Sequence, residues 1–193
     1  MRRFAPTLSA IAGFTVRHGR NAQLLALAGG TLAVRAIGAR AQQRPACIVR
    51  PEQTEGPYFV PGSPRRRSLR AGLAGRPLLL TGRVLSPSCR PRRHALLDFW
   101  QADGAGEYDN EGSGGRGHQY TDAQGRFRLA TVVPGLYPGR TRHIHVKVQP
   151  RGGELLTTQL YFPREARNRG DGIFDEALLM RVTGTRARFD FVV

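Results

Sequence analysis

The chain has few of the features that mark several large protein classes. Its 193 residues contain no uninterrupted apolar run of the roughly 20 residues that a membrane-spanning helix needs, so we expect no stable membrane insertion. Acidic residues are scarce: there are 14 against 30 basic ones, and Lys147 is the only lysine. The 40% apolar content is nevertheless enough for one packed domain.

The formal charge of +16 does not by itself indicate a nucleic-acid partner. Nucleic-acid-binding proteins gather basic residues on one face and often add aromatic residues that stack on bases. Here the arginines are scattered along the chain, and their runs at 65–67 and 90–93 fall in Pro/Ser-rich segments. We therefore expect solvated loops, no nucleic-acid binding and a general attraction for small anions.

The first 41 residues have the composition of a targeting segment. They carry six arginines and no acid, then the apolar stretch LLALAGGTLAV, and they end on Ala39 and Ala41 in an A-x-A arrangement. This pattern predicts an export signal that is cleaved after Ala41. The twin arginines Arg2 and Arg3 suggest the twin-arginine export route, but the route is left open. The protein is then periplasmic or secreted; if the segment is only an extension, the protein is cytoplasmic.

Cysteine is also scarce. Cys47 and Cys89 are the only two, and both follow the predicted signal. In an oxidising compartment they can form a disulfide, but two cysteines do not establish one, so free buried thiols remain an alternative.

Short apolar or alternating runs separated by Gly/Pro/Asp turns predict an all-β fold, a single β-sandwich with long loops over residues 76–193. Residues 42–75 are proline-rich without strand periodicity and predict an arm that wraps the sandwich. The predicted strands cover residues 78–85, 94–101, 126–132, 143–149, 156–162, 178–183 and 187–193. Residues 162–170 predict at most a short helical turn.

Two histidines lie one residue apart in the strand predicted at 143–149. In an extended chain His143, His145 and Lys147 share one face, while Ile144 and Val146 point to the other. One interpretation is an ordinary strand with an apolar core face and a polar solvent face. The other is that both imidazoles point at one metal ion.

Two tyrosines in neighbouring turns favour the metal interpretation. Tyr108 closes the turn DGAGEYD, and Tyr137 lies in PGLYP, six residues before His143. Two phenolates and two imidazoles form a mixed oxygen and nitrogen ligand set, and no Cys/His zinc spacing competes for it. A phenol has a pKa near about 10, so its ionisation at neutral pH requires a strongly acidic ion. This favours iron(III), with copper(II) as the second candidate.

Four motifs in order make the chain resemble the intradiol ring-cleavage dioxygenases, nearer to protocatechuate 3,4-dioxygenase subunits and their exported relatives than to catechol 1,2-dioxygenases. The motifs are QTEGPYF, DFWQADGAGEYD, GRGHQYTDAQGRFRLATVVPGLYPGRTRHIHVKV and LTTQLYF. They cover roughly residues 46–163, and residues 164–193 match weakly. The resemblance implies a prealbumin-like β-sandwich that holds non-haem iron(III).

The resemblance also implies roles for individual residues. The implied iron ligands are Tyr108, Tyr137, His143 and His145. Tyr137 would also accept a proton from the substrate, Arg140 would stabilise developing negative charge, and Gln159 would orient the intermediate. Gly56, Pro57 and Tyr58 would border the substrate pocket. Protocatechuate enzymes usually have Arg-Pro-Ala where this chain has RTR. Arg140, favoured by its spacing, and Arg142 therefore both remain candidates for the arginine that faces the iron.

The implied reaction inserts both atoms of O₂ into a catechol or protocatechuate-class diol between its two hydroxylated carbons, giving a cis,cis-muconate-type acid. The expected partners are a small aromatic diol and O₂, and a homo-oligomer is left open. A non-catalytic, transthyretin-like sandwich that binds a carbohydrate, peptide or protein is the alternative. Such a module has no reason to keep two tyrosines and an H-x-H pair together.

Overall fold

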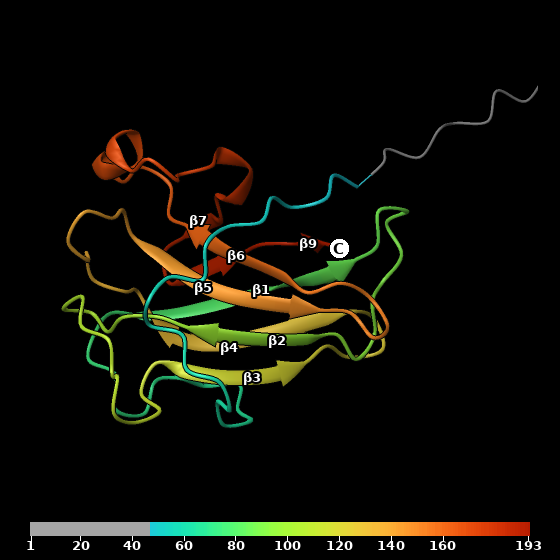
Figure 1. Cartoon of the computed structure of the whole chain (residues 1–193), viewed down its shortest axis with the longest axis horizontal. Helices are drawn as coiled ribbons and strands as arrows, with labels where there is room; N and C mark the ends of the chain where they lie inside the picture. The colour runs from blue at the N-terminus through green and yellow to red at the C-terminus, as the bar shows by residue number, and fades with distance from the viewer. Residues whose placement is uncertain (1–46) are drawn as a thin grey trace, which may run out of the picture. The chain divides into compact units, whose positions relative to one another are not determined.

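The computed structural model describes residues 47–193, which form two β-sheets packed face to face (Figure 1). The strands are β1 (Pro77–Leu85), β2 (Leu96–Trp100), β3 (Arg116–Tyr120), β4 (Arg126–Val132), β5 (His143–Gln149), β6 (Leu156–Tyr161), β7 (Arg181–Thr183), β8 (Arg186–Arg188) and β9 (Phe191–Val192). Two short 3-10 helices, η1 (Ala166–Gly170) and η2 (Glu176–Leu178), lie between β6 and β7. The predicted all-β sandwich is confirmed.

The sheets differ in how their strands are ordered. The four-stranded sheet has the order β3-β2-β5-β6 and is antiparallel throughout. The five-stranded sheet has the order β4-β1-β8-β7, with β9 also paired to β1. Strand β1 pairs antiparallel with β4 and parallel with β8 and β9, so the end of the chain returns to its first strand.

The core lies between the two sheets. Alternate residues of each strand point into it, as the period of two requires; examples are Leu80 from β1, Phe99 from β2, Leu129 from β4 and Val146 from β5. The residues between them point away from the core, so each sheet also has an outer face. These two outer faces are the surfaces on which polar side chains collect.

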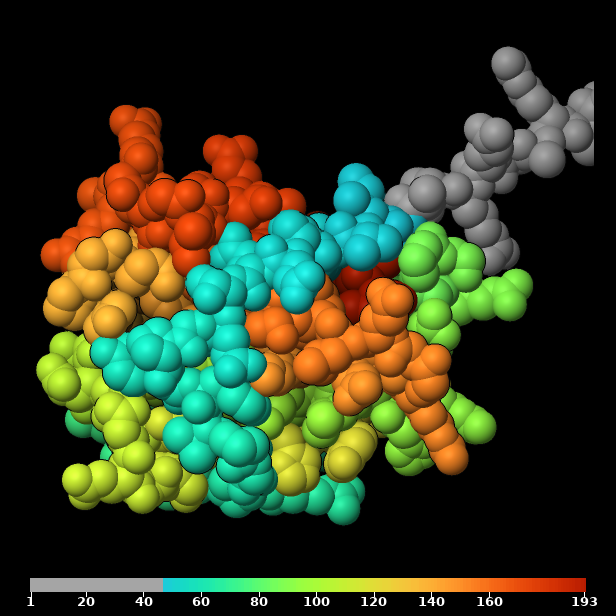
Figure 2. Space-filling model, in the orientation of Figure 1, coloured from blue at the N-terminus to red at the C-terminus, as the bar shows by residue number. Residues whose placement is uncertain are grey.

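An irregular arm, residues 47–76, crosses the outer face of the four-stranded sheet and covers part of it (Figure 2). Its backbone is tied to the sheet by hydrogen bonds, including those from the Gln53 amide to the Thr157 carbonyl (2.8 Å) and from the Arg66 amide to the His118 carbonyl (2.9 Å). Its start is tied by a disulfide between Cys47 and Cys89 (S–S 2.18 Å). The sequence left this pairing open.

The strand predictions hold for β1, β2, β4, β5 and β6 within two residues at each end. They were wrong in two places. Strand β3, with the sequence RGHQY, was missed because it follows a glycine-rich loop and has no apolar alternation. The last two predicted strands are shorter than expected: the first begins only at Arg181, after η2 at residues 176–178, and the second is interrupted at residues 189–190, between β8 and β9.

The predicted export signal, residues 1–41, and the first residues of the predicted arm lie outside the described residues. Within residues 47–193, no helix is both long and apolar enough to cross a membrane.

Candidate functional site

The two histidines of β5 lie on its outer side, beneath the arm. His143 and His145 are only 5% and 3% exposed, and their Nε2 atoms are 3.0 Å apart. The Nδ1 of His143 is 2.6 Å from the Thr141 carbonyl, which can only accept a hydrogen bond. The proton of His143 is therefore on Nδ1, which leaves the Nε2 lone pair directed at the space shared with His145.

Both imidazoles are held in the neutral form. Burial lowers the pKa of His143 to about 4, although its contact with the Thr141 carbonyl opposes this, and burial also lowers the pKa of His145 well below its usual value. The nearby charge of Arg140 acts in the same direction as burial on both rings. At neutral pH both rings therefore offer lone pairs, the form in which histidine binds metals.

The geometry of the pair fits a shared metal ion. Two ligands at a right angle, each with a bond of about 2.1 Å, are separated by about 3.0 Å. Within residues 47–193, no three side chains of the types His, Cys, Asp and Glu are grouped to hold a metal. A metal at the histidine pair therefore requires donors of another type.

Tyrosine side chains surround the pair. The ring centroids of Tyr108 and His145 are 6.4 Å apart, and those of Tyr108 and Tyr137 are 6.2 Å apart. Tyr58 stacks on Tyr108 at 4.2 Å, and its hydroxyl donates to the Tyr137 hydroxyl at 3.0 Å. The structure thus brings together all four predicted ligands, with Tyr58 between the two predicted tyrosine ligands.

The protein alone does not favour ionised tyrosines here. Burial raises the pKa of Tyr108 well above its ordinary value, and the hydrogen bond to Tyr137 raises the pKa of Tyr58. Phenolate ligands at this site would require a cation that stabilises the negative oxygen more than burial destabilises it.

Tight turns position the two predicted tyrosine ligands. The Asp103 carboxylate accepts hydrogen bonds from three successive amides, including that of Gly106 (3.0 Å), and this shapes the turn that ends at Tyr108. Gly106 has a φ of +99°, and a Cβ there would lie 2.4 Å from the Leu136 carbonyl oxygen. The backbones that carry Tyr108 and Tyr137 are therefore in direct contact, which only glycine permits.

Arg140 and Gln159 form the next layer of the site. Gln159 is opposite His145 in the β5–β6 register, and its Oε1 accepts from Nη2 of Arg140 at 2.6 Å. Nε of Arg140 donates to the Asp171 carboxylate at 2.9 Å. Arg142 makes other contacts: its Nε donates to Glu165 at 2.8 Å, and its Nη1 donates to the Pro134 carbonyl.

The arm supplies the remaining predicted residues. Gly56 has a φ of +73°, and a Cβ there would lie 3.4 Å from Cε1 of His145, so the arm backbone passes directly over this ring. Pro57 is exposed and Tyr58 is partly buried. The side-chain Nε2 of Gln159 donates to the Thr54 carbonyl at 3.0 Å, which ties the arm to β6 at this point.

Three further residues of the site were missed at the sequence level. The ring of Trp100, the last residue of β2, stacks on His145 at 4.8 Å. Arg116 is 3% exposed, and its guanidinium donates to the carbonyls of Tyr58 and Asp109, so it joins the arm to the Tyr108 turn. Asp171 holds Arg140. Of these three residues, only Trp100 could have been identified from the sequence, because it is the only tryptophan and ends a strand next to the Tyr108 turn. No sequence feature marked Arg116 or Asp171.

Comparison with known proteins places these features in a family. A family model described as dioxygenase matches residues 54–183, beyond the residues 46–163 covered by the motifs. The protocatechuate 3,4-dioxygenase beta chain of Burkholderia cepacia is 36% identical in an alignment of 118 residues that covers 52% of this chain and 50% of that protein. The 6-chlorohydroxyquinol 1,2-dioxygenase of Cupriavidus pinatubonensis is 28% identical, over 72% of this chain and 62% of that protein. The chain thus spans between half and two thirds of the length of these relatives.

Solved structures agree with this placement. The dioxygenase domain of a dioxygenase carbohydrate-binding protein fusion from Streptomyces sp. SirexAA-E is 55% identical, with a TM-score of 0.72 over 76% of this chain and 98% of that one. The 3-chlorocatechol 1,2-dioxygenase of Rhodococcus opacus 1CP is 30% identical, with a TM-score of 0.68 over 74% of this chain and 71% of that one. The chain belongs to the intradiol ring-cleavage dioxygenase family.

Proposed function

We propose that this protein is a non-haem iron(III)-dependent oxidoreductase that cleaves a catechol-type aromatic diol between its two hydroxylated carbons. Both atoms of O₂ would enter a cis,cis-muconate-type product, from a substrate of the catechol or protocatechuate class. The observation that carries the proposal is the buried pair of neutral imidazoles, His143 and His145, with two tyrosines beside it. Membership of the family supports the same reaction.

The proposed iron ligands are Tyr108, Tyr137, His143 and His145. Their chemistry fits a hard trivalent cation, because two phenolates neutralise most of its charge and two imidazoles complete the set. When bound, iron(III) would lower the pKa of the phenols and of the diol, and it would draw electron density from the substrate ring.

The chain itself would handle protons and developing charge. Tyr137 would accept a proton from the diol, with the Tyr58 hydroxyl holding its oxygen in place at 3.0 Å. Arg140 would donate to the negative charge that develops on the reacting oxygen. Its side chain is already oriented by Asp171 and Gln159, so little reorganisation would be needed. Gly56, Pro57 and Tyr58 would form one wall of the substrate site.

Colour and iron content give the most direct test. Protein purified with iron should contain about one iron per chain and show a visible tyrosinate-to-iron absorption band. Tyr108→Phe should lose most of this band, whereas Tyr120→Phe, the same change at an exposed tyrosine, should keep it. His145→Asn should lose the iron, and His94→Asn, at an exposed histidine, should retain it. A Tyr108→Phe variant with unchanged colour would refute the ligand assignment.

The reaction is tested by oxygen uptake with a panel of catechol, protocatechuate and hydroxyquinol. Mass spectrometry of a product formed under ¹⁸O₂ should show two labelled atoms in a dicarboxylic acid. A colourless protein that consumes no oxygen with any of these diols after iron loading would favour the transthyretin-like binding module instead.

We also propose that residues 1–41 direct export. Expression with this segment should give periplasmic or secreted protein that begins at Gln42, as determined by amino-terminal sequencing. An uncleaved cytoplasmic product would contradict this proposal.

A further inference from the structure

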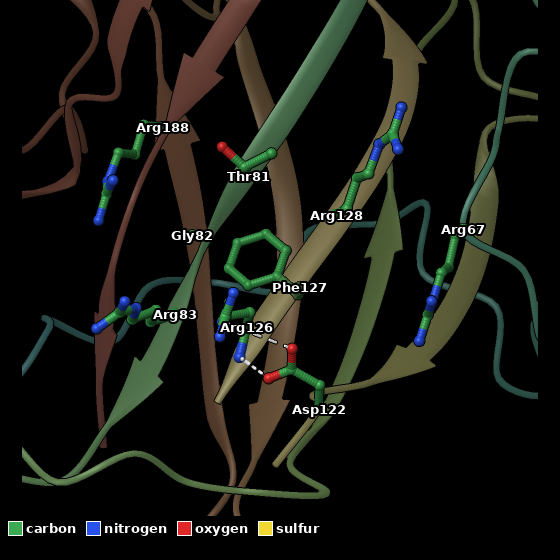
Figure 3. Close-up of a pocket in the computed structure, with 9 residues that line it drawn as sticks. All are labelled: Arg67, Thr81, Gly82, Arg83, Asp122, Arg126, Phe127, Arg128 and Arg188. Atoms are coloured by element: carbon green, nitrogen blue, oxygen red, sulfur yellow. Dashed lines mark hydrogen bonds and ion pairs between the residues drawn. The ribbon is translucent and has the colours of Figure 1, made fainter. Parts of the chain in front are cut away.

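A second polar surface lies on the outer face of the five-stranded sheet, on the side of the sandwich opposite the histidine pair. Thr81 and Arg83 of β1 and Arg128 of β4 alternate with core residues, so they point away from the core. Together with neighbouring arginines they line a groove of about 320 Å³ (Figure 3). We call this surface the arginine groove; its arginines are Arg67, Arg83, Arg126, Arg128 and Arg188.

The fold places these arginines in register. Arg83 is directly opposite Arg126 in the antiparallel β1–β4 pair. Thr81 lies between Arg128 on β4 and Arg188 on β8, so these three residues form a row across three strands. Neighbouring strands are about 4.8 Å apart, which sets the spacing of the row.

The arm extends the row by one more segment. The Arg67 carbonyl accepts a hydrogen bond from the Ala130 amide at 2.9 Å, so the arm runs along the free edge of β4. The side chain of Arg67 lines the groove from that edge (Figure 3). The arm and three strands, β1, β4 and β8, therefore contribute cations to one surface.

The positive charge of the groove is not balanced by the protein. Within residues 47–193, only two of its arginine side chains form ion pairs: Nε of Arg126 is 3.7 Å from Asp122, and Nη2 of Arg188 is 3.3 Å from Asp190. Arg83 contacts Asp190 through its backbone amide alone (2.9 Å). Three exposed side chains have no anionic partner within residues 47–193: Arg67, Arg83 and Arg128. Like charges directly opposite each other destabilise a sheet, so an external anion would relieve this repulsion.

We propose that the arginine groove binds a linear acidic polysaccharide, whose successive carboxylates pair with successive guanidinium groups. Arginine offers a planar pair of N–H donors that matches a carboxylate. A row of arginines across several strands can contact several charges of a repeating anion at once, whereas a single small anion would contact only part of the row. The Thr81 hydroxyl in the middle of the row donates to the Ala187 carbonyl at 3.4 Å, and its lone pairs can accept a hydrogen bond from a sugar hydroxyl.

Other polyanionic partners match the groove less well. Its lining contains none of the exposed large apolar side chains within residues 47–193, which include Tyr120, Val60 and Leu155. Single-stranded nucleic acids are bound on exposed aromatic side chains, and membrane-surface proteins insert apolar ones. The lining strands are neighbours in a five-stranded sheet, whereas the major groove of a duplex admits a helix or a two-stranded ribbon.

Binding of polygalacturonate to the purified full chain tests the proposal. Calorimetry in calcium-free buffer should detect binding that weakens as salt rises, and no binding of the fully methyl-esterified polymer. Arg83→Gln/Arg128→Gln should weaken binding about 10-fold or more, since two of the three uncompensated cations are lost. The matched control Arg92→Gln/Arg93→Gln removes the same charge from exposed loop arginines elsewhere, and it should change binding less than about 3-fold.

The possible outcomes are distinct. Equal weakening by both double variants would show that net charge alone attracts the polymer, and it would overturn the proposal. So would tighter binding of a DNA duplex or of phosphatidylglycerol vesicles with the same dependence on Arg83 and Arg128. Circular dichroism and thermal unfolding of both double variants would confirm that they are folded. Ring-cleavage activity should be unchanged in both, because the groove and the proposed iron site lie on different sheets.

Discussion

Both sheets of the sandwich alternate core-facing and outward residues, but the outward residues of the two sheets differ in their exposure to solvent. On the four-stranded sheet the outward residues His143 and His145 are covered by the arm and almost fully buried. On the five-stranded sheet the outward residues Arg83 and Arg128 are open to solvent. The position of the arm, more than the polarity of the strands, decides which face can hold a desolvated reaction centre.

Burial changes what polar groups can do. Under the arm, desolvation keeps the imidazoles neutral, and the guanidinium of Arg140 has specific partners in Asp171 and Gln159. A buried charge needs such partners because its desolvation is costly. In the arginine groove water solvates the cations, so they can remain without partners and stay available to an external anion.

The largest expected effect comes from releasing the start of the arm. The Cys47–Cys89 disulfide closes a loop with a sequence separation of 42, for which chain entropy predicts about 4 kcal/mol of stabilisation. Cys47→Ser/Cys89→Ser should therefore lower the free energy of unfolding by up to about 4 kcal/mol, measured in urea. Reduced wild-type protein should unfold at the same urea concentration. An unchanged midpoint would show that the hydrogen bonds of the arm hold it without the disulfide.

The next prediction concerns the two arginines before the histidine pair. Arg140→Met should lower kcat/KM between about 100- and 1,000-fold, as loss of a donor to developing negative charge does in other enzymes. Arg142→Met removes the same side chain two residues away, where it contacts Glu165 and the Pro134 carbonyl, and kcat/KM should fall less than about 3-fold. Steady-state oxygen uptake measures both, and the reverse order would assign the role to Arg142.

A third prediction compares a buried arginine with an exposed one. Arg116→Met should destabilise the protein by about 2 kcal/mol, because the carbonyls of Tyr58 and Asp109 lose a charged donor. Arg126→Met, in the arginine groove, loses only a solvent-exposed ion pair and should change stability by less than about 0.5 kcal/mol. Urea unfolding measures both, and equal effects would contradict the contrast between the two faces.

The smallest expected effect is a gain in stability. Arg83→Thr removes one of two like charges that are directly opposite in the β1–β4 pair, and threonine suits a strand. We expect the free energy of unfolding to rise by about 0.5 kcal/mol at low salt. The gain should disappear at about 1 M salt, where charges are screened within about 3 Å. A loss of stability at low salt would show that the arginines of the groove do not repel one another.

Local patterns predicted much of the fold. The alternation in LLLTGRVL, RFRLATV and HIHVKV gave β1, β4 and β5 nearly to the residue, because burial of one face of a sheet imposes a period of two. Strand β3 was missed because its residues follow glycines and lack that period. The disulfide, the order of the strands and the break between β8 and β9 depend on contacts between distant segments, which no local pattern contains.

The predicted site residues are brought together in space, and their roles stay predictions. Motifs located Tyr108, Tyr137 and the histidine pair, because each occupies a turn or strand with a distinctive local sequence. They did not show which arginine contacts Gln159. Asp171 is about 30 residues further along the chain than Arg140, and only the tertiary structure reveals their hydrogen bond.

The sequence by itself determined that the two histidines point the same way, since residues two apart in a strand share a face. It also determined that two tyrosines lie in glycine-rich turns near them. The tertiary structure decided that the arm covers this face, and that arginines scattered from Arg67 to Arg188 gather on the other. The first kind of information comes from neighbours along one strand, whereas the second comes from the pairing of distant segments, which depends on the packing of the whole domain.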